Sequence, residues 1–508
     1  MAVRTYLALA CLAAGLVGSA WLPHALKHTP RGLPIRGQVL DTSGPLRGAR
    51  VRFQGQPLSV LTGLDGSFSL PQPKRDVGKI TAFKNGYLIG SAVPEGGQPP
   101  KIVLSRLPPQ DDALYRWVDP TPNPARAHNC GNCHEQTFRE WSISGHARSA
   151  TNRHFLNLYN GTDWFGHANV GWSLRADRPE TTGVCTPCHA PTMEDLTNPA
   201  YDDLAQIRGV PAQGVHCDYC HKIVAADNRK IGLTHGRFGL RLLRPEHGQL
   251  FFGPLDDVDR HEDSALAVYR DSRYCASCHE GTVLSVHVYS TYSEWQRSPA
   301  AREGKQCQTC HMAPTGKMTN LAPGKGGIER DPQTLANHRF FVGDQASMLR
   351  RCLQVKVELK PTPTVVEARV YVRAQDVGHC VPTGFVDHNL VLLVEATDHA
   401  GRPLPRRAGP ALPKAAGGQL VDQAGRLYAR LLHDESSAPV PFWRADPDFE
   451  DTRLRPDQTN QSVFTFPPNA AQVRVRLLYR RFWPQVAGSK HWPDKDLVVL
   501  DRTRLVSP

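Results

Sequence analysis

The feature that most constrains this 508-residue chain is the motif Cys-x-x-Cys-His, which occurs five times between residues 130 and 311. Its cysteines are Cys130, Cys133, Cys185, Cys188, Cys217, Cys220, Cys275, Cys278, Cys307 and Cys310, and its histidines are His134, His189, His221, His279 and His311. With 13 cysteines and 22 histidines in the chain, the motif should arise by chance only about 0.01 times. The spacing is that of c-type heme attachment, in which two thioethers hold one porphyrin edge and the histidine supplies an axial nitrogen to iron. We call the motifs clips 1 to 5, and they predict five covalently bound hemes.

Two other uses of Cys-x-x-Cys pairs fit the sequence less well. Zinc ribbons place two pairs about 15 to 20 residues apart with histidines elsewhere, whereas here every pair carries its own histidine. A disulfide framework gives no reason for a histidine after each pair. We therefore assign the ten cysteines to heme and the five histidines to iron.

The clips show signs of internal duplication. The intervals between successive first cysteines alternate between long and short along the chain, a rhythm that suggests a repeated unit. The segments CGNCHEQTFREWSISGHA, from residue 130, and CASCHEGTVLSVHVYSTYSEWQRSPAA, from residue 275, share C-x-x-C-H-E followed by E-W-x-x-S. Trp141 and Trp295 are predicted to pack against porphyrin. His146 stands where the second copy has Ala300, so it is predicted to cap a heme other than its own.

Each iron has a second axial face, which a histidine, a methionine or a substrate can occupy. The candidate distal ligands are His146, His338, His379, His261 and His235. A second histidine on every iron would make an electron carrier, whereas an open face would leave room for chemistry.

The segments on either side of the clips alternate like β-strands. Turn signals such as Asp65-Gly66 separate the runs before the clips, and runs such as NLVLLVEATD follow them. The predicted fold is therefore multidomain, with a small β-sandwich over 30–108, a largely α-helical or irregular multiheme domain over 109–345, and a β-sandwich over 346–508.

The N-terminal segment, 1–29, is expected to direct export. No formal charge occurs between Arg4 and Lys27, and the apolar run suits either a cleaved signal peptide or a retained membrane anchor. Both deliver the rest of the chain across the inner membrane. The protein is therefore expected in the periplasm, where it is free, anchored to the inner membrane or exposed at the cell surface. In such an oxidising compartment the two spare cysteines, Cys352 and Cys380, are predicted to form a disulfide.

The formal charge of +12 does not indicate nucleic-acid binding, because Lys and Arg are scattered among Asp and Glu without a block of like charges. A net positive protein is instead expected to dock to an acidic redox partner or to a partner linked to membrane quinol.

The clip region resembles the multiheme c-type cytochrome family related to the tetraheme electron acceptor of hydroxylamine oxidoreductase. The resemblance rests on C-x-x-C-H-E and W-x-x-S-x-H-A within 130–147, GVHCDYCHKI at 214–223, YSEWQRSPAAREGKQCQTCHM at 292–312, NHRF at 337–340 and GHCVPTG at 378–384. It implies that the histidine of S-x-H-A, here His146, caps a neighbouring heme. It also implies periplasmic or surface electron transfer, in some relatives with nitrogen or sulfur compounds.

Residues 30–108 resemble the carboxypeptidase regulatory-like module. The matching residues are Gly37, Val39, Gly48, Ala49, Val51, Thr62, Asp65, Gly66, Phe68, Gly86 and Tyr87. The resemblance implies a small, non-catalytic sandwich that serves adhesion or spacing.

Two functions follow from the sequence, and no catalytic residue is assigned. The first is a pentaheme cytochrome that passes electrons along its hemes. The alternative is a multiheme oxidoreductase that acts on a small inorganic nitrogen or sulfur compound at a five-coordinate heme. Ammonia-forming nitrite reductase binds substrate at a heme with a lysine clip, whereas all five clips here end in histidine. A purely structural protein would have no need of five hemes.

Overall fold

The structure is a computed structural model that describes residues 33–72, 78–95, 98–193, 204, 207–227, 229–340 and 345–507. The chain separates into two compact units, one from Met1–Ala82 with Ser91–Val103 and the other from Phe83–Gly90 with Leu104–Pro508. The predicted export segment, 1–29, lies outside the described residues. In the described part of the chain, no helix combines the length and the apolar character needed to cross a bilayer.

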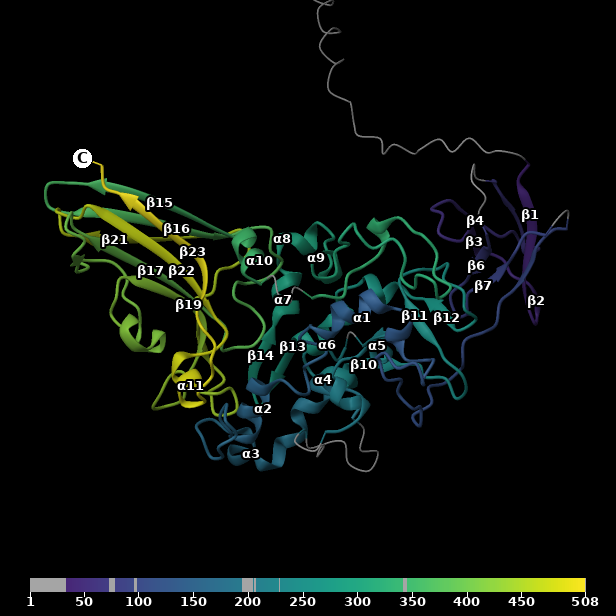
Figure 1. Ribbon diagram of the computed structural model, residues 1–508, viewed down its shortest axis with the longest axis horizontal. Coiled ribbons are helices and arrows are strands. Elements are labelled where there is room, and N and C mark those ends of the chain that lie inside the picture. Colours follow the sequence, from purple (N-terminus) through teal and green to yellow (C-terminus); the bar gives the residue numbers. More distant parts are fainter. Residues whose placement is uncertain are drawn as a thin grey trace, which may run out of the picture. The chain divides into compact units, whose positions relative to one another are not determined.

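The first unit is built from short strands in two small sheets, drawn in purple in Figure 1. The strands are β1 (Ile35–Asp41), β2 (Gly44–Pro45), β3 (Arg50–Phe53), β4 (Ser59–Leu61), β5 (Ser67–Leu70), β6 (Ile80–Phe83), β7 (Gly90–Ala92) and β8 (Lys101–Val103). One sheet has the order β2-β1-β5 with β8 parallel to β1, and the other has the order β4-β3-β6-β7. Gly66 belongs to the predicted Asp65-Gly66 turn and has φ +71°. A Cβ atom at this position would lie 2.4 Å from the Val39 carbonyl oxygen, so only glycine fits.

The clip region consists of short helical turns joined by loops and two-stranded ribbons. The α-helices are α1 (Glu135–Ser142), α2 (Arg153–Asn160), α3 (Leu174–Asp177), α4 (Thr186–His189), α5 (Cys217–Cys220), α6 (Arg273–His279), α7 (Thr291–Gln296), α8 (Pro299–Arg302), α9 (Cys307–His311) and α10 (Gln345–Cys352). The 3-10 turns are η1 (Cys130–Asn132), η2 (Pro179–Cys185), η5 (Val210–Gln213), η6 (Gly236–Gly239), η7 (Ala267–Arg270) and η8 (Pro332–Thr334). The ribbons pair β9 (Ile223–Ala226) with β10 (Leu240–Leu242), β11 (Phe251–Gly253) with β12 (Asp263–Ala265), and β13 (Glu280–Val283) with β14 (Val286–Ser290).

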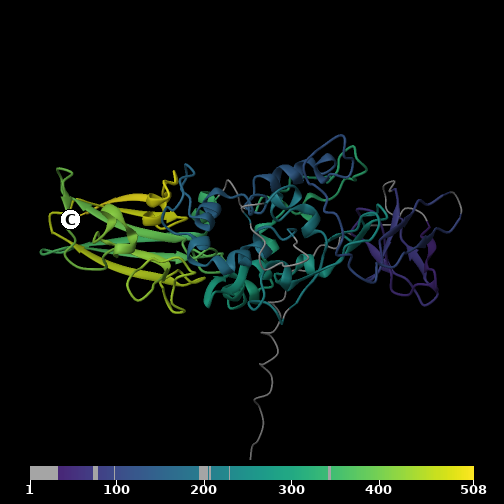
Figure 2. The same cartoon turned by 90° about the horizontal axis from the view of Figure 1, so that it is seen from below.

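Two larger sheets follow the clip region, in green and yellow in Figures 1 and 2. Their strands are β15 (Leu353–Pro361), β16 (Val366–Ala374), β17 (Asn389–Thr397), β18 (Pro403–Leu404), β19 (Gly425–Leu432), β20 (Phe449–Asp451), β21 (Thr459–Phe466), β22 (Gln472–Arg480) and β23 (Leu497–Leu505). One sheet has the order β15-β16-β21, and the other has the order β20-β19-β17-β22-β23 with β18 beside β17. The turns η9 (Lys414–Ala416) and η10 (Gly418–Leu420) and the helix α11 (Pro484–Ser489) lie in the connections. The run NLVLLVEATD, predicted as a strand, is β17.

The central strand β17 is buried on both faces. Leu390 and Leu392 face a core between the two sheets, together with side chains such as Val370 and Val475. The alternate residues, including Leu393, face a second core that also contains side chains of the clip region. These clip-region residues include Leu158, Tyr159, Leu174, Val286 and Val288. The six-stranded sheet therefore forms a wall shared by the sandwich and the clip region, and the predicted boundary at 345/346 does not separate two independent cores.

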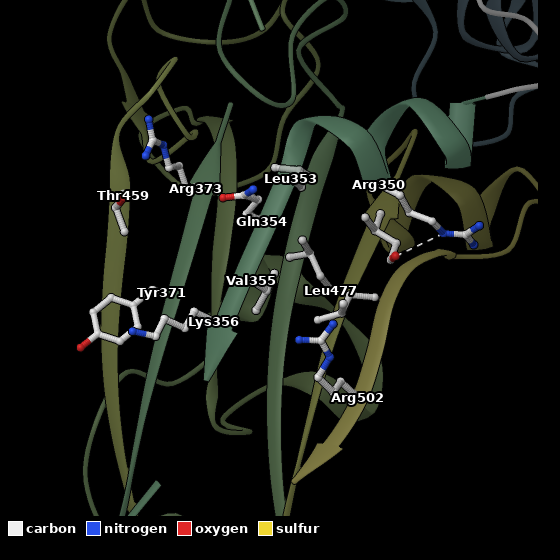
Figure 3. A pocket seen from close by; sticks show the side chains of 12 residues that line it. Arg350, Leu353, Gln354, Val355, Lys356, Tyr371, Arg373, Thr459, Leu477 and Arg502 are labelled. Atoms are coloured by element: carbon white, nitrogen blue, oxygen red, sulfur yellow. Dashed lines mark hydrogen bonds between the residues drawn. The ribbon is translucent and has the colours of Figure 1, made fainter. Parts of the chain in front are cut away.

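A cavity of about 690 Å³ lies between the edge strands β15 and β23 (Figure 3). Its floor is apolar and includes Val355 and Leu477, and several basic side chains surround it. They are Arg350, Lys356, Arg373 and Arg502. Basic residues at sheet edges discourage pairing with other chains. No clip residue lines this cavity, so it is not part of the predicted heme region.

We expect Leu392→Ala and Leu393→Ala each to lower the free energy of unfolding by about 2–5 kcal/mol, because each removes a fully buried side chain from its core. Denaturant unfolding measures this loss. Only Leu393→Ala should also increase proteolytic cleavage within 104–352, since its core includes that region. Val498→Ala, at a 43% exposed position, serves as the control and should change stability by less than about 0.5 kcal/mol. Equal cleavage in both leucine variants would contradict the shared-wall arrangement.

Candidate heme centres

The five clips all lie on tight helical turns. Clip 1 begins in η1, clip 2 runs from the end of η2 into α4, and clips 3, 4 and 5 occupy α5, α6 and α9. Residues three apart in such turns lie on one face, so both cysteines of a clip can point toward one ligand edge. The geometry thus suits attachment of one flat group at two points.

Three clip histidines are oriented by backbone carbonyls. The Nδ1 atoms donate hydrogen bonds as follows: His134 to Leu321 O at 2.9 Å, His189 to Ser149 O at 2.8 Å, and His221 to Phe252 O at 2.6 Å. A carbonyl oxygen can only accept, so the proton lies on Nδ1 and Nε2 keeps its lone pair. This is the usual arrangement of a metal-binding histidine, whose other nitrogen is held by a fixed acceptor.

Two clip histidines face a second histidine from a distant part of the chain. The ring centroids of His279 and His146 are 6.2 Å apart with an interplanar angle of 69°. Those of His311 and His379 are also 6.2 Å apart, with an angle of 35°. His379 Nδ1 donates to the Cys380 carbonyl oxygen at 3.0 Å, which leaves its Nε2 available.

The distance between the facing rings tests whether the residues fit an iron between them. In such a site the iron lies between the two rings. The metal–nitrogen bond is about 2 Å long, and the bound nitrogen lies about 1.1 Å from the centroid of its ring. The two distances on each side of the iron together separate the ring centroids by about 6.2 Å. Both observed pairs match this value. The residues therefore fit hemes with two axial histidines at clips 4 and 5.

Burial keeps these imidazoles neutral, which metal binding requires. The pKa of His146 is lowered to about 4 by burial and by nearby His279. Burial and nearby His379 lower the pKa of His311 to about 3. The pKa of His338 is likewise lowered to about 3, by burial and then by His221, which places these two side chains near each other.

His338 has a buried polar atom without a partner. Its Nδ1 forms no hydrogen bond with any described residue. A buried imidazole nitrogen in this state is costly unless something else occupies it. The segment is fixed by the His338 backbone N–H, which donates to Glu140 Oε2 at 2.9 Å. His338 is therefore a buried imidazole on a fixed segment near His221, and it stays a candidate distal ligand.

The structure places the other two candidate ligands differently. His235 Nε2 donates to the Thr282 carbonyl oxygen at 2.8 Å, so one ring nitrogen is occupied. Its neighbour Gly236, at φ +56°, approaches clip 2 so closely that a Cβ atom would lie 1.9 Å from Pro187 O. His261 has an 81% exposed side chain beside Asp259, with Nδ1 and Oδ1 3.5 Å apart. Within the described ranges, no ring contact with a clip histidine is found for either of them, unlike His146 and His379, whose ring centroids lie 6.2 Å from those of His279 and His311.

The predicted disulfide between Cys352 and Cys380 is wrong, because both thiols are free. Cys380 is buried, and its backbone N–H donates to Glu294 Oε2 at 3.0 Å, which holds it against α7. Cys352 instead ends α10, where Arg351, Cys310 and Asp376 are the groups that influence its thiol electrostatically. The structure therefore keeps the two cysteines as separate thiols, although an oxidising compartment would favour a disulfide.

The clips lie against one another. The thiols of Cys130 and Cys217 are in hydrogen-bond contact, which joins clip 1 to clip 3. Further thiol contacts join clip 4 to its neighbours: Cys275 to Cys307 of clip 5, and Cys278 to Cys188 of clip 2. Groups attached at these cysteines would therefore start from adjacent points.

An ion pair joins Asp218 of clip 3 to Lys222, the residue after the clip, and it was not predicted from the sequence. Asp218 and Lys222 are fully buried, and Lys222 Nζ lies 2.5 Å from Asp218 Oδ1. Asp218 Oδ2 also accepts from the Val118 backbone N–H and the Tyr115 hydroxyl. The spacing of four residues in CDYCHK was the available signal, since it places the two charges on one helical face.

Comparison with known proteins finds no matching family model and no matching curated protein for this chain. Its fold is nevertheless similar to that of a solved multiheme cytochrome. One solved structure that it resembles is a penta-heme cytochrome c552 from Thermochromatium tepidum, with a TM-score of 0.53 and 22% identity over 74% of this chain and 97% of that chain. The predicted relation to the electron acceptor of hydroxylamine oxidoreductase, and that of residues 30–108 to the regulatory-like module, stay predictions.

We expect Asp387→Asn to raise thermal stability at pH 8 but hardly at pH 4. Burial raises the pKa of Asp387 to about 8, and its Oδ2 has no partner among the described residues. The folded pKa lies above the unfolded value of about 3.9, so the stability that depends on the protonated carboxyl is complete below pH 4 and is lost as the pH rises to 8. Melting temperatures of both proteins across this range measure the effect, and a difference independent of pH would contradict the assignment.

Proposed function

We propose that this protein is a pentaheme c-type cytochrome that passes electrons along five covalently bound hemes. Cysteine pairs of clips 1 to 5 would hold hemes 1 to 5 by thioethers, with His134, His189, His221, His279 and His311 as proximal ligands. The carrying observation is the pair of facing rings at 6.2 Å, His279 with His146 and His311 with His379. Two axial histidines favour electron transfer, because they leave no open face for a substrate.

The close packing of the clips supports transfer between hemes. Contacts run from clip 2 to clip 4 and on to clip 5, and from clip 1 to clip 3. Tyr219 of clip 3 is influenced electrostatically by Cys278 and Cys188, which brings clip 3 near clips 2 and 4. Porphyrins attached at such neighbouring points would form a continuous array for electrons.

The proposal extends to location and partners. Thioether-bound hemes and the apolar run in residues 1–29 support export to the periplasm. The exported protein is either free there, anchored to the inner membrane or displayed at the cell surface. The formal charge of +12 favours an acidic redox partner. Five heme groups would bring ten propionates, which reduces this charge without reversing it once the ferric irons are counted.

The hemes themselves are tested by spectroscopy of the exported protein. We expect five hemes per chain in the pyridine hemochrome assay and low-spin ferric EPR signals that nitrite, hydroxylamine and sulfite do not alter. A count well below five would overturn the cofactor assignment. A high-spin signal that responds to one of these compounds would replace the carrier by the oxidoreductase that acts at a five-coordinate heme.

We expect His146→Ala to convert heme 4, and no other heme, from low spin to high spin. The substitution removes the imidazole that faces His279 but leaves the clip itself intact, so the heme count should stay at five. EPR and heme staining measure the two effects. His247→Ala, at an 89% exposed side chain, is the matched control and should leave all signals unchanged. An unaltered spectrum in His146→Ala would rule out this ligand pair.

A further inference from the structure

We propose that each Glu-Trp pair of the duplicated motif positions the two axial ligands of one heme. The tryptophan holds the segment that carries the proximal ligand, and the glutamate holds the segment that carries the distal ligand. The pairs are Glu140-Trp141 and Glu294-Trp295. This inference rests on the proposed heme function and adds residues that are neither thioether anchors nor iron ligands. It also assigns a third axial pair, His221 with His338, to heme 3.

The tryptophans make equivalent bonds in the two copies. Trp141 Nε1 donates to the carbonyl oxygen of Val215 at 2.9 Å, and Trp295 Nε1 donates to that of Lys305 at 2.8 Å. Each acceptor stands two residues before the first cysteine of a clip, Cys217 in clip 3 and Cys307 in clip 5. The indole N–H therefore fixes the chain where it enters a clip, a role beyond the packing predicted from sequence.

The helical turns that follow are capped in equivalent ways. The residue between each acceptor and its clip is the N-cap, His216 for α5 and Gln306 for α9. The His216 side chain accepts from the Tyr219 backbone N–H at 3.4 Å, and the Gln306 side chain accepts from that of Thr309. Clips 3 and 5 therefore share a local construction that begins at the tryptophan bond.

The glutamates hold the segments that carry distal histidines. Glu140 Oε2 accepts from the backbone N–H of His338 at 2.9 Å. Glu294 Oε2 accepts from the backbone N–H of Cys380, next to His379, at 3.0 Å and from the Thr383 hydroxyl at 2.9 Å. Both glutamates are largely buried, so these charge-assisted bonds are strong and have few competing partners in water.

The two bonds of each pair converge on one metal position. In the second copy, Trp295 fixes clip 5 and Glu294 fixes His379, and His311 of clip 5 faces His379 at 6.2 Å. In the first copy, Trp141 fixes clip 3 and Glu140 fixes His338. The equivalent axial pair is therefore His221 of clip 3 with His338. The neighbouring residues of a dipeptide thus set the positions of two ligands that lie far apart in the sequence.

The next turn explains why the copies differ at His146 and Ala300. Ser144 and Ser298 each accept from the backbone N–H three residues later, at 3.3 Å in both copies. Ala300 then lies against the His379 segment, because a Cβ atom on Gly378 would be 3.4 Å from Ala300 Cβ and 3.1 Å from Trp295 Cδ1. In the first copy the same position carries His146, whose ring contacts Phe340 at 4.4 Å and also faces His279.

Glu294 is supported by more charge than Glu140. Arg453 lies 2.8 Å and Arg430 3.5 Å from Glu294 Oε1, and all three side chains are at most 8% exposed. Burial alone would raise the pKa of Glu294, but Arg453 and the hydrogen bonds from Ser290 and Thr383 lower it. An alanine at 294 would remove a carboxylate from two buried guanidinium groups and leave them other contacts, such as those to Asp451 and Ser290, so variants that keep this network are also needed.

The decisive experiment compares EPR signals and heme-resolved redox titrations of full-length heme-loaded variants. Glu294→Ala and Trp295→Phe should each weaken the low-spin signal that His379→Ala removes, with a high-spin signal in its place and five hemes still attached. Glu140→Ala should instead affect the signal that His338→Ala removes. Glu140→Gln should behave as the wild type, because its amide oxygen can still accept from the His338 N–H. Thr383→Val removes one bond to Glu294 and keeps the arginine network, so it should shift the potential of the same heme in a protein that folds.

Matched controls and outcomes separate this proposal from the heme assignment. Glu303→Ala, at an exposed glutamate paired with Lys305, should leave all signals and potentials unchanged. If Glu294→Ala, Trp295→Phe and Thr383→Val all retain wild-type signals and potentials, the positioning role is wrong while the five-heme assignment stands. It is also wrong if the Glu140 and Glu294 variants affect one and the same heme. If the wild-type protein itself showed no low-spin signals, the heme function on which the inference rests would be wrong.

Discussion

The rest of the structure depends on one covalent constraint, the two cysteines and the histidine that must reach a single flat group from one helical turn. The helical turns of the clips contain only three to seven residues, and isolated helices shorter than about 12 residues are marginal in water. They are therefore held by their surroundings. Carbonyls orient His134, His189 and His221, and thiol contacts set clip against clip. In the proposed holoprotein the porphyrins would supply the apolar core that such short turns cannot make alone.

The clips could be predicted from sequence because they are local, whereas the partners of their histidines could not. His146 was singled out by its absence from the second copy, but only the fold brings it within 6.2 Å of His279. The candidates His261 and His235 have the right residue type. Their surroundings differ, because one side chain is exposed and the other donates to Thr282 O. The disulfide failed for the same reason, since composition and compartment say nothing about which cysteines meet.

The strands after the clips were also predictable, but their role in the whole was not. Alternation identifies a strand with one buried face, and β17 lacks such alternation because both of its faces are buried. Its residues Leu392 and Leu393 belong to two different cores. A buried run in the sequence therefore marked the position where the sandwich and the clip region share a sheet, although it was interpreted only as one strand of a separate domain.

The structure also changes how the duplication is understood. The alternation of long and short intervals between the clips suggests a unit that repeats every second clip. The hydrogen bonds of Trp141 and Trp295 instead relate clips 1 and 3 to clips 4 and 5, and the thiol contacts Cys130–Cys217 and Cys275–Cys307 relate the same clips.

Clip 2 then lies within the first copy and has no counterpart in the second, where Trp295 and Lys305 are close together in the sequence. Because clip 2 contacts clip 4 through Cys188 and Cys278, this additional clip connects the two copies. His146, also present in one copy only, makes a second connection to clip 4. The features that break the repeat are therefore those that join its two halves.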